Sequence, residues 1–126
     1  MSKKNICVVG GGSWGGNHIK TLKKLGVLSA VVDENQELLD SYKKEFPDID
    51  VFRNVNQSFK KKYDGYIIAT PAETHFEIAK KIIKRKIDLL VEKPLALSIQ
   101  ESETLVRLAR ENKVSLMVGH VLLFHP

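Results

Sequence analysis

The sequence has a single cysteine, few aromatic residues and no long hydrophobic run. Cys7 has no second cysteine with which to form an internal disulfide, and 7% of the 126 residues are aromatic. No apolar run reaches the roughly 18 residues that a membrane-spanning helix needs. The basic start at residues 1–5 is followed by too short an apolar stretch for a signal peptide. These absences predict a cytoplasmic protein with a reduced cysteine and no membrane contact.

Metal-binding and nucleophilic arrangements are also missing from the sequence. One cysteine and four widely separated histidines give no cluster with the spacing of a metal site. No serine–histidine–aspartate arrangement can be read either. We therefore predict that the site holds no metal.

Positive charge exceeds negative charge only slightly. Twenty lysines and arginines stand against 15 acidic residues, which gives a formal net charge of +5. This surplus suits an anionic small molecule but is too scattered to predict nucleic-acid binding. The basic runs at residues 60–62 and 80–86 lack the interleaved aromatic residues of a single-strand binder, so we expect solvated faces there. A basic nucleic-acid binder therefore stays an alternative function that the charge distribution does not favour.

The length and the hydropathy pattern predict one α/β domain. A chain of 126 residues with 43% apolar residues is typical of a single globular domain. Short apolar runs predict strands at residues 6–9, 27–33, 51–52, 66–69, 88–91 and 116–118. Amphipathic stretches predict helices at residues 14–25, at residues 36–46, around residues 76–83, and after the capping box at residues 98–101. Continuous apolar strands between helices are typical of a doubly wound parallel sheet, a three-layer α/β/α Rossmann fold.

Two segments fit this pattern poorly. Residues 54–63 give no clear helix or strand signal. Residues 121–124 are apolar, with nothing after them in the sequence to bury them. The simplest explanation is that the sequence is truncated before a further domain that would cover this end. Otherwise we expect the apolar end to be covered by self-association, as in a homo-oligomer, or by a partner.

The strongest motif is a glycine loop between the first strand and the first helix. Gly10, Gly12 and Gly15 form G-x-G-x-x-G, with Ser13 and Trp14 inside it. In a dinucleotide-binding loop the first glycine permits the tight turn, the second admits a pyrophosphate, and the third allows close helix–strand packing. The helix N-terminus then receives the phosphates. A turn without a ligand and a methyltransferase that binds an adenosyl group remain alternative interpretations.

Asp33 supports a dinucleotide in particular. It ends the second predicted strand, 23 residues after Gly10, near the spacing of the carboxylate that binds the adenosine ribose. Asp33 and the adjacent Glu34 would repel a 2′-phosphate, so the sequence favours NAD over NADP.

Three further segments follow predicted parallel strands, at residues 69–75, 91–94 and 118–120. Ligands of open α/β sheets bind outside the carboxyl ends of the strands, so these segments should face the same crevice as the glycine loop. Lys93 is the side chain that we expect to hold or move a substrate proton there. His75 and His120 are candidates for ligand contact, while His18 and His125 are weaker ones.

These motifs together resemble the N-terminal domain of the glucose–fructose oxidoreductase, inositol dehydrogenase and rhizopine-catabolism family of NAD(P)-dependent oxidoreductases. The matching segments are the glycine loop, ATPAETH at residues 69–75 and VEKPLALS at residues 91–98. The pattern G-x-W-G-x-N-H at residues 12–18 and the ending VGHVLLFHP most resemble the branch that oxidises the 3-hydroxyl of UDP-linked amino-sugar uronic acids in polysaccharide biosynthesis.

The resemblance implies hydride transfer between a sugar or sugar-nucleotide carbon and the nicotinamide of NAD. It implies that Lys93 is catalytic and lies next to the reacting carbon, and that the Lys93–Pro94 bond is often cis. The implied cofactor-binding residues are Gly10, Gly12, Ser13, Trp14, Gly15, Asp33, Thr70, Pro71, His75, Glu92, Lys93, Pro94 and His120. Members of the family continue into a substrate domain, which would begin near residue 126. The alternative interpretation is a stand-alone NAD-binding or redox-sensing module without catalysis.

Overall fold

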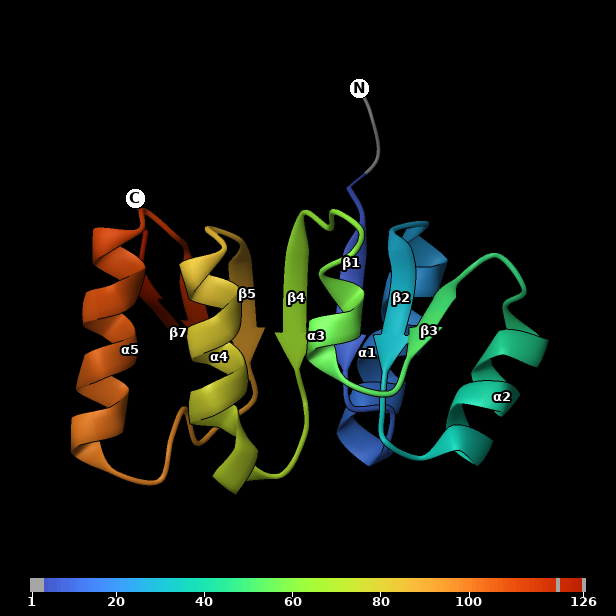
Figure 1. The fold of residues 1–126 in the computed structure, drawn as a ribbon, viewed down its shortest axis with the longest axis horizontal. Coiled ribbons are helices and arrows are strands. Elements are labelled where there is room, and N and C mark those ends of the chain that lie inside the picture. Colours follow the sequence, from blue (N-terminus) through green and yellow to red (C-terminus); the bar gives the residue numbers. More distant parts are fainter. Residues whose placement is uncertain (1–3, 120, 126) are drawn as a thin grey trace.

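The chain forms a seven-stranded sheet with helices on both faces (Figure 1). This computed structural model describes residues 4–119 and 121–125. The strands are β1 (Ile6–Val9), β2 (Leu28–Val32), β3 (Asp50–Phe52), β4 (Gly65–Ile68), β5 (Asp88–Val91), β6 (Leu116–Val118) and β7 (Val121–Phe124). The helices are α1 (Ser13–Leu25), α2 (Gln36–Glu45), α3 (Val55–Ser58), α4 (His75–Lys84) and α5 (Ile99–Glu111), with a 3₁₀ turn η1 (Ala72–Thr74) before α4.

The strand order is β3-β2-β1-β4-β5-β6-β7, and all neighbours from β3 to β6 are parallel. The chain runs outward from β1 to β3, returns to β4 beside β1, and then runs outward on the other side. This reversal places the topological switch point between β1 and β4, where ligands of such sheets bind. In Figure 1 the arrows of β2, β4 and β5 point to the lower edge, where the loops that follow them gather. The predicted doubly wound Rossmann fold is confirmed.

Both faces of the sheet are buried, which explains the continuous apolar runs of the strands. Val8 and Val31 belong to the cluster under α1 and α2, together with Ile19 of α1. Cys7 and Val9, which alternate with Val8, belong to the larger cluster under α3, α4 and α5. Burial raises the pKa of the Cys7 thiol well above its usual range.

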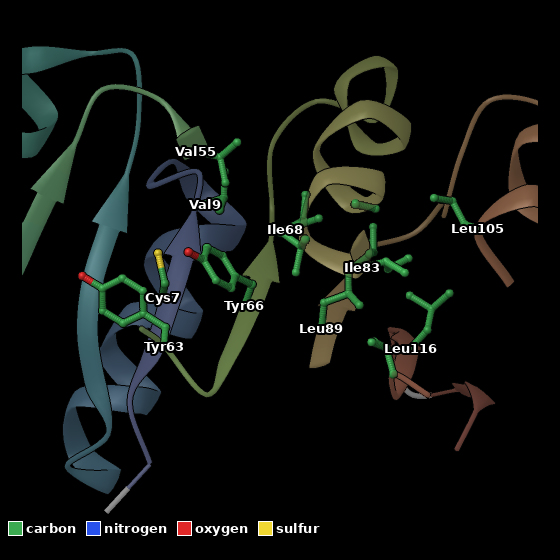
Figure 2. Packing of buried hydrophobic residues seen from close by; sticks show 14 of the residues in the cluster. Cys7, Val9, Val55, Tyr63, Tyr66, Ile68, Ile83, Leu89, Leu105 and Leu116 are labelled. Atoms are coloured by element: carbon green, nitrogen blue, oxygen red, sulfur yellow. The ribbon is translucent and has the colours of Figure 1, made fainter. Parts of the chain in front are cut away.

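Figure 2 shows the larger cluster, in which Tyr66 lies beside Tyr63 and Val55. A buried polar contact at Tyr66 fixes α3. Tyr66 of β4 is 1% exposed, and its ring meets that of Tyr63 edge-on at a centroid distance of 6.0 Å. The Ser58 hydroxyl donates to the Val55 carbonyl, and the Tyr66 hydroxyl donates to Ser58 Oγ at 2.8 Å. Burial raises the pKa of Tyr66 to about 12. The phenol therefore stays a donor at neutral pH.

The predicted strands, and the helices at residues 14–25 and 36–46, agree with the observed bounds to within one residue. Local signals at the helix ends account for this agreement. Gly26 closes α1 in the left-handed conformation, with φ of 75°. Ser98 Oγ accepts a hydrogen bond from the Glu101 N–H at 3.1 Å, as the capping box predicts.

The structure differs from the expectation at the two poorly matching segments. Residues 55–58 form α3, whose N-terminus is capped by the Asn54 side chain. Residues 121–124 form β7, which pairs antiparallel with β6, so the sheet is not wholly parallel and this end has a partner within the chain. Leu122 and Leu123 nevertheless remain 48% and 38% exposed.

Candidate functional site

The glycine loop is built from close backbone contacts that exclude side chains. Gly10 has φ of 99°, and a Cβ there would lie 2.8 Å from the carbonyl group of Ala69. A Cβ at Gly15 would lie 1.7 Å from the Gly10 carbonyl oxygen. At Gly12 a Cβ would meet no described atom within 4 Å. Gly10 and Gly15 are therefore required by the fold, whereas the space at Gly12 is open to a ligand.

The N-terminus of α1 follows directly from this open position. Gly12 is the cap residue and provides no side chain, and the first turn has no acidic residue. The positive end of the helix thus has neither a side-chain cap nor an acidic residue in its own first turn. Ser13 and Trp14, the first two residues of α1, are exposed, Trp14 to 68%. This end of α1 can receive an anionic group.

Asp33 is tied to the glycine loop by its carboxylate. Oδ2 accepts a hydrogen bond from the Gly11 N–H at 2.8 Å, and Oδ1 accepts one from the Asn35 N–H at 2.9 Å. The Tyr42 hydroxyl donates to the Gly11 carbonyl at 2.8 Å, and burial, with help from Glu45 and Asp33, raises the pKa of Tyr42. Each oxygen of Asp33 keeps a free lone pair in a fixed direction. The carboxylate can therefore accept two hydroxyl groups from a ribose.

A cleft of about 570 Å³ opens between these groups and the loop after β4. Its walls come from β1, β2 and β4 at their carboxyl ends, from residues 53–55 and from α4. It is lined by Val9, Gly10, Gly12, Val32, Asp33, Glu34, Arg53, Asn54, Val55, Ala69, Thr70, Pro71, Glu73, Thr74, Ile78 and Lys81. Apolar walls with Asp33 at one side and Gly12 at another suit a purine nucleoside with an attached phosphate.

The cleft brings together five of the predicted site residues. Gly10, Gly12, Asp33, Thr70 and Pro71 line it. Ser13, Trp14, Gly15, His75, Glu92, Lys93 and Pro94 do not, and His120 lies outside the described residues. A second hollow of about 440 Å³, over α5 and beside Leu95 and Leu123, contains none of the predicted site residues.

Glu92, Lys93 and Pro94 form a turn after β5, which we call the signature turn. The Glu92 N–H donates to the Ile68 carbonyl at 2.9 Å, which ties the turn to the end of β4. The Lys93–Pro94 bond is cis, as the resemblance implies. Lys93 is exposed and makes no hydrogen bond or ion pair with any described residue. Its ammonium group is available to a ligand.

His75 connects the signature turn to the loop after β4. Its side chain is buried, with 1% of the residue exposed. Nδ1 lies 2.8 Å from the Pro94 carbonyl oxygen, and Nε2 lies 2.7 Å from the Thr70 carbonyl oxygen. Both ring nitrogens thus face backbone acceptors. Direct contact between His75 and a cofactor stays a prediction, and the geometry adds a role in joining two loops of the site.

His18 makes a side-chain contact that the sequence did not predict. Its Nε2 pairs with Oε1 of Glu92, across 74 residues of sequence. The contact exists because α1, which packs against β1 and β2, brings His18 to the turn after β5, an arrangement that local patterns do not reveal. The only signal in the sequence was the place of His18 in G-x-W-G-x-N-H, directly after the glycine loop.

Neither a metal site nor a membrane span is found in the described part of the chain. No group of three or more histidine, cysteine or acidic side chains there could hold a metal ion. No helix within residues 4–119 or 121–125 is long and apolar enough to cross a membrane.

Comparison with known proteins identifies relatives along almost the whole chain. The chain is 30% identical over 124 residues to UDP-N-acetylglucosamine 3-dehydrogenase of Acidithiobacillus ferrooxidans, covering 94% of this chain and 37% of that protein. The crystal structure of GenD2 from gentamicin A biosynthesis in complex with NAD superposes with a TM-score of 0.87 at 30% identity, covering 94% of this chain and 35% of that one. The WlbA dehydrogenase of Bordetella pertussis, at 24% identity and a TM-score of 0.87, shares the fold, over 94% of this chain and 37% of its own. The chain spans about a third of the length of these relatives.

A family model also matches the chain, in addition to these individual relatives. The profile of the oxidoreductase family with an NAD-binding Rossmann fold covers residues 4–120, which include the glycine loop, Asp33 and the signature turn. The resemblance drawn from the motifs is therefore confirmed. The chain belongs to this oxidoreductase family.

Proposed function

We propose that residues 1–126 form the NAD-binding domain of an oxidoreductase that acts on a hydroxyl group of a sugar or sugar nucleotide. The observation that carries this proposal is the Asp33 carboxylate, fixed by the Gly11 N–H at 2.8 Å beside the open space at Gly12. A pyrophosphate fits where a Cβ at Gly12 would meet no described atom, and ribose hydroxyls fit the free lone pairs of Asp33.

The chain's own residues then divide the work between binding and proton handling. The uncapped N-terminus of α1 holds the pyrophosphate, and the Asp33 carboxylate accepts the hydroxyls of the adenosine ribose. Thr70 and Pro71 wall the cleft on the β4 side. The Lys93 ammonium, exposed and without a partner among the described residues, donates a hydrogen bond to the substrate hydroxyl oxygen and stabilises the negative charge that develops there while a base from outside residues 1–126 takes the proton. Bound NAD supplies the hydride acceptor.

The substrate class is argued from the relatives. A relative at 30% identity is named for oxidation at position 3 of UDP-N-acetylglucosamine, so a sugar nucleotide is the substrate that we propose. Because the chain spans about a third of the length of these relatives, we propose that contacts to the sugar come from outside residues 1–126. We also propose a cytoplasmic setting, and self-association through the exposed Leu122 and Leu123 of β7.

The proposal is tested by titrating the ¹⁵N-labelled chain with NADH, NADPH and S-adenosylmethionine, with calorimetry beside the NMR spectra. We expect NADH to bind and to shift the amide signals of Gly10, Gly12, Asp33 and Thr70. NADPH should bind more weakly because its 2′-phosphate meets the Asp33 carboxylate. Binding of S-adenosylmethionine with no response to NADH would replace the proposal with the methyltransferase alternative.

A further inference from the structure

The pair between His18 and Glu92 joins two distant parts of the proposed site. His18 lies on α1, the helix that begins at the glycine loop, and Glu92 opens the signature turn after β5. The two side chains are only 26% and 24% exposed. A pair that is three-quarters shielded from water is less weakened by solvent than a pair on the open surface.

Both ends of this pair are held by backbone contacts. The Glu92 N–H donates to the Ile68 carbonyl at 2.9 Å, so the main chain of Glu92 is fixed to β4. On the other side, the near contact between Gly15 and the Gly10 carbonyl locks α1 against the glycine loop. His18, one turn further along α1, therefore connects the glycine loop rigidly to the signature turn.

The opposite end of the signature turn is held by a second contact. The Pro94 carbonyl oxygen lies 2.8 Å from Nδ1 of the buried His75. Lys93 thus stands between two anchored neighbours, Glu92 and Pro94, while its own side chain is exposed and has no partner among the described residues. The turn is fixed, and the lysine that it presents is free.

Glu92 is also the carboxylate next to Lys93 in the sequence. A carboxylate released from His18 could turn toward the neighbouring ammonium and form a charge-assisted hydrogen bond with it. That bond would compete with the substrate hydroxyl, or with the nicotinamide half of the cofactor, for Lys93. In the structure the Glu92 carboxylate accepts a hydrogen bond from His18 Nε2 instead.

We propose that His18 is a positioning residue for Lys93: by holding the Glu92 carboxylate on α1, it keeps the signature turn in the form that receives the nicotinamide half of NAD. This inference rests on the proposed function, because it assumes that the dinucleotide extends from the cleft to the signature turn. It assigns His18 no contact with the cofactor.

The inference is tested with two substitutions at His18 and two ligands. His18→Phe keeps a ring of similar size but has no donor, whereas His18→Gln carries an amide nitrogen near the place of Nε2. Each variant is titrated with NADH and with ADP-ribose, which lacks the nicotinamide. We expect His18→Phe to weaken NADH binding about ten-fold and ADP-ribose binding less than about two-fold, and His18→Gln to restore most of the NADH affinity. The exposed Lys20 of the same helix provides the control, and Lys20→Ala should bind both ligands like the original chain.

A further variant shows whether His18 acts through Glu92. In a Glu92→Ala background, His18→Phe should cause no additional loss of NADH affinity, because the partner has already been removed. Additive losses would overturn the inference, and so would NADH affinity unchanged in His18→Phe, or equal losses for NADH and ADP-ribose. If His18→Phe fails to fold, Glu92→Ala takes its place. Glu92→Ala should then weaken NADH binding more than ADP-ribose binding, while His18→Gln keeps most of the affinity for NADH. The proposed function fails separately, if the original chain binds no NADH at all.

Discussion

The Cα of Gly15 faces the carbonyl oxygen of Gly10 so closely that a Cβ at Gly15 would lie 1.7 Å from that oxygen. No side-chain movement can relieve such a clash, because both partners are backbone. The glycine loop and α1 are therefore in direct main-chain contact. At Gly12, by contrast, a Cβ meets no described atom within 4 Å. The glycines of one motif thus serve two separate purposes.

Alanine substitutions should separate these purposes. Gly15→Ala should lower the free energy of unfolding by about 3 kcal/mol, because α1 must move away from the loop. Gly12→Ala should change stability by less than about 0.5 kcal/mol but weaken NADH binding about ten-fold or more, because its methyl group fills the pyrophosphate space. Urea denaturation and calorimetric titration measure the two effects. A Gly12→Ala variant that binds NADH normally would mean that the pyrophosphate does not lie at Gly12.

Replacing Asp33 should change the choice of cofactor. Asp33→Ser removes both the ribose acceptors and the charge that repels a 2′-phosphate, so NAD affinity should fall roughly ten- to a hundred-fold and the gap to NADP should narrow. Asp40→Ser, on the exposed face of α2, is the matched control. An unchanged preference in Asp33→Ser would place the ribose elsewhere.

Most of the fold could be predicted because its strands are buried on both faces. Val8 and Val9, for example, point into different clusters and are both buried, so the run reads as apolar without interruption. The helix α3 could not be predicted, since its four residues are too short for a helical period. The strand β7 was visible as an apolar run, but its pairing with β6 depends on the tertiary fold.

For the site, the sequence indicated candidate residues but few of the contacts between them. The spacing of Asp33 from Gly10 predicted a carboxylate near the glycine loop, and Oδ2 of Asp33 is bonded to the adjacent Gly11. The contact of His18 could not be predicted because its partner, Glu92, is 74 residues away in the sequence. The contacts of His75 could not be predicted because its partners are backbone carbonyls. Such partners have no local signature.

Asp50 should make stability depend on pH. Burial tends to raise its pKa, but hydrogen bonds from Lys61 and Tyr63, at 2.7 Å each, lower it below the usual value. A carboxyl with a lowered pKa stabilises the fold above its unfolded pKa and loses this effect as the pH falls through its folded pKa. Asp50→Asn should therefore cost about 1 kcal/mol at pH 7, and the difference from the original chain should shrink below about pH 4.

This effect is checked by urea denaturation at neutral and acid pH. NADH affinity at pH 7 serves as a control and should not change, since Asp50 does not line the cleft. A constant difference between the two proteins across the pH range would show that Asp50 is not ionised differently in the folded and unfolded chains.

The chain of 126 residues should bind NAD without turning over a sugar. Hydride transfer needs the reacting carbon held about 3–3.5 Å from the nicotinamide, and such positioning supplies much of the rate. Lys93 is exposed, and we propose that the contacts to the sugar come from outside residues 1–126. We expect no NADH formation from NAD with UDP-N-acetylglucosamine or a polyol. Turnover by the chain alone, abolished in Lys93→Ala, would mean that these residues suffice for catalysis.

The measurement that tests the account most directly is the fluorescence of Trp14 during an NADH titration. Trp14 is the only tryptophan, lies at the start of α1 and is 68% exposed. NADH bound at the glycine loop should quench its emission and receive energy from it, and Gly12→Ala should shift this response to higher concentration. NADPH should produce little change. A flat titration up to millimolar NADH, with the chain folded, would contradict the assignment of the site.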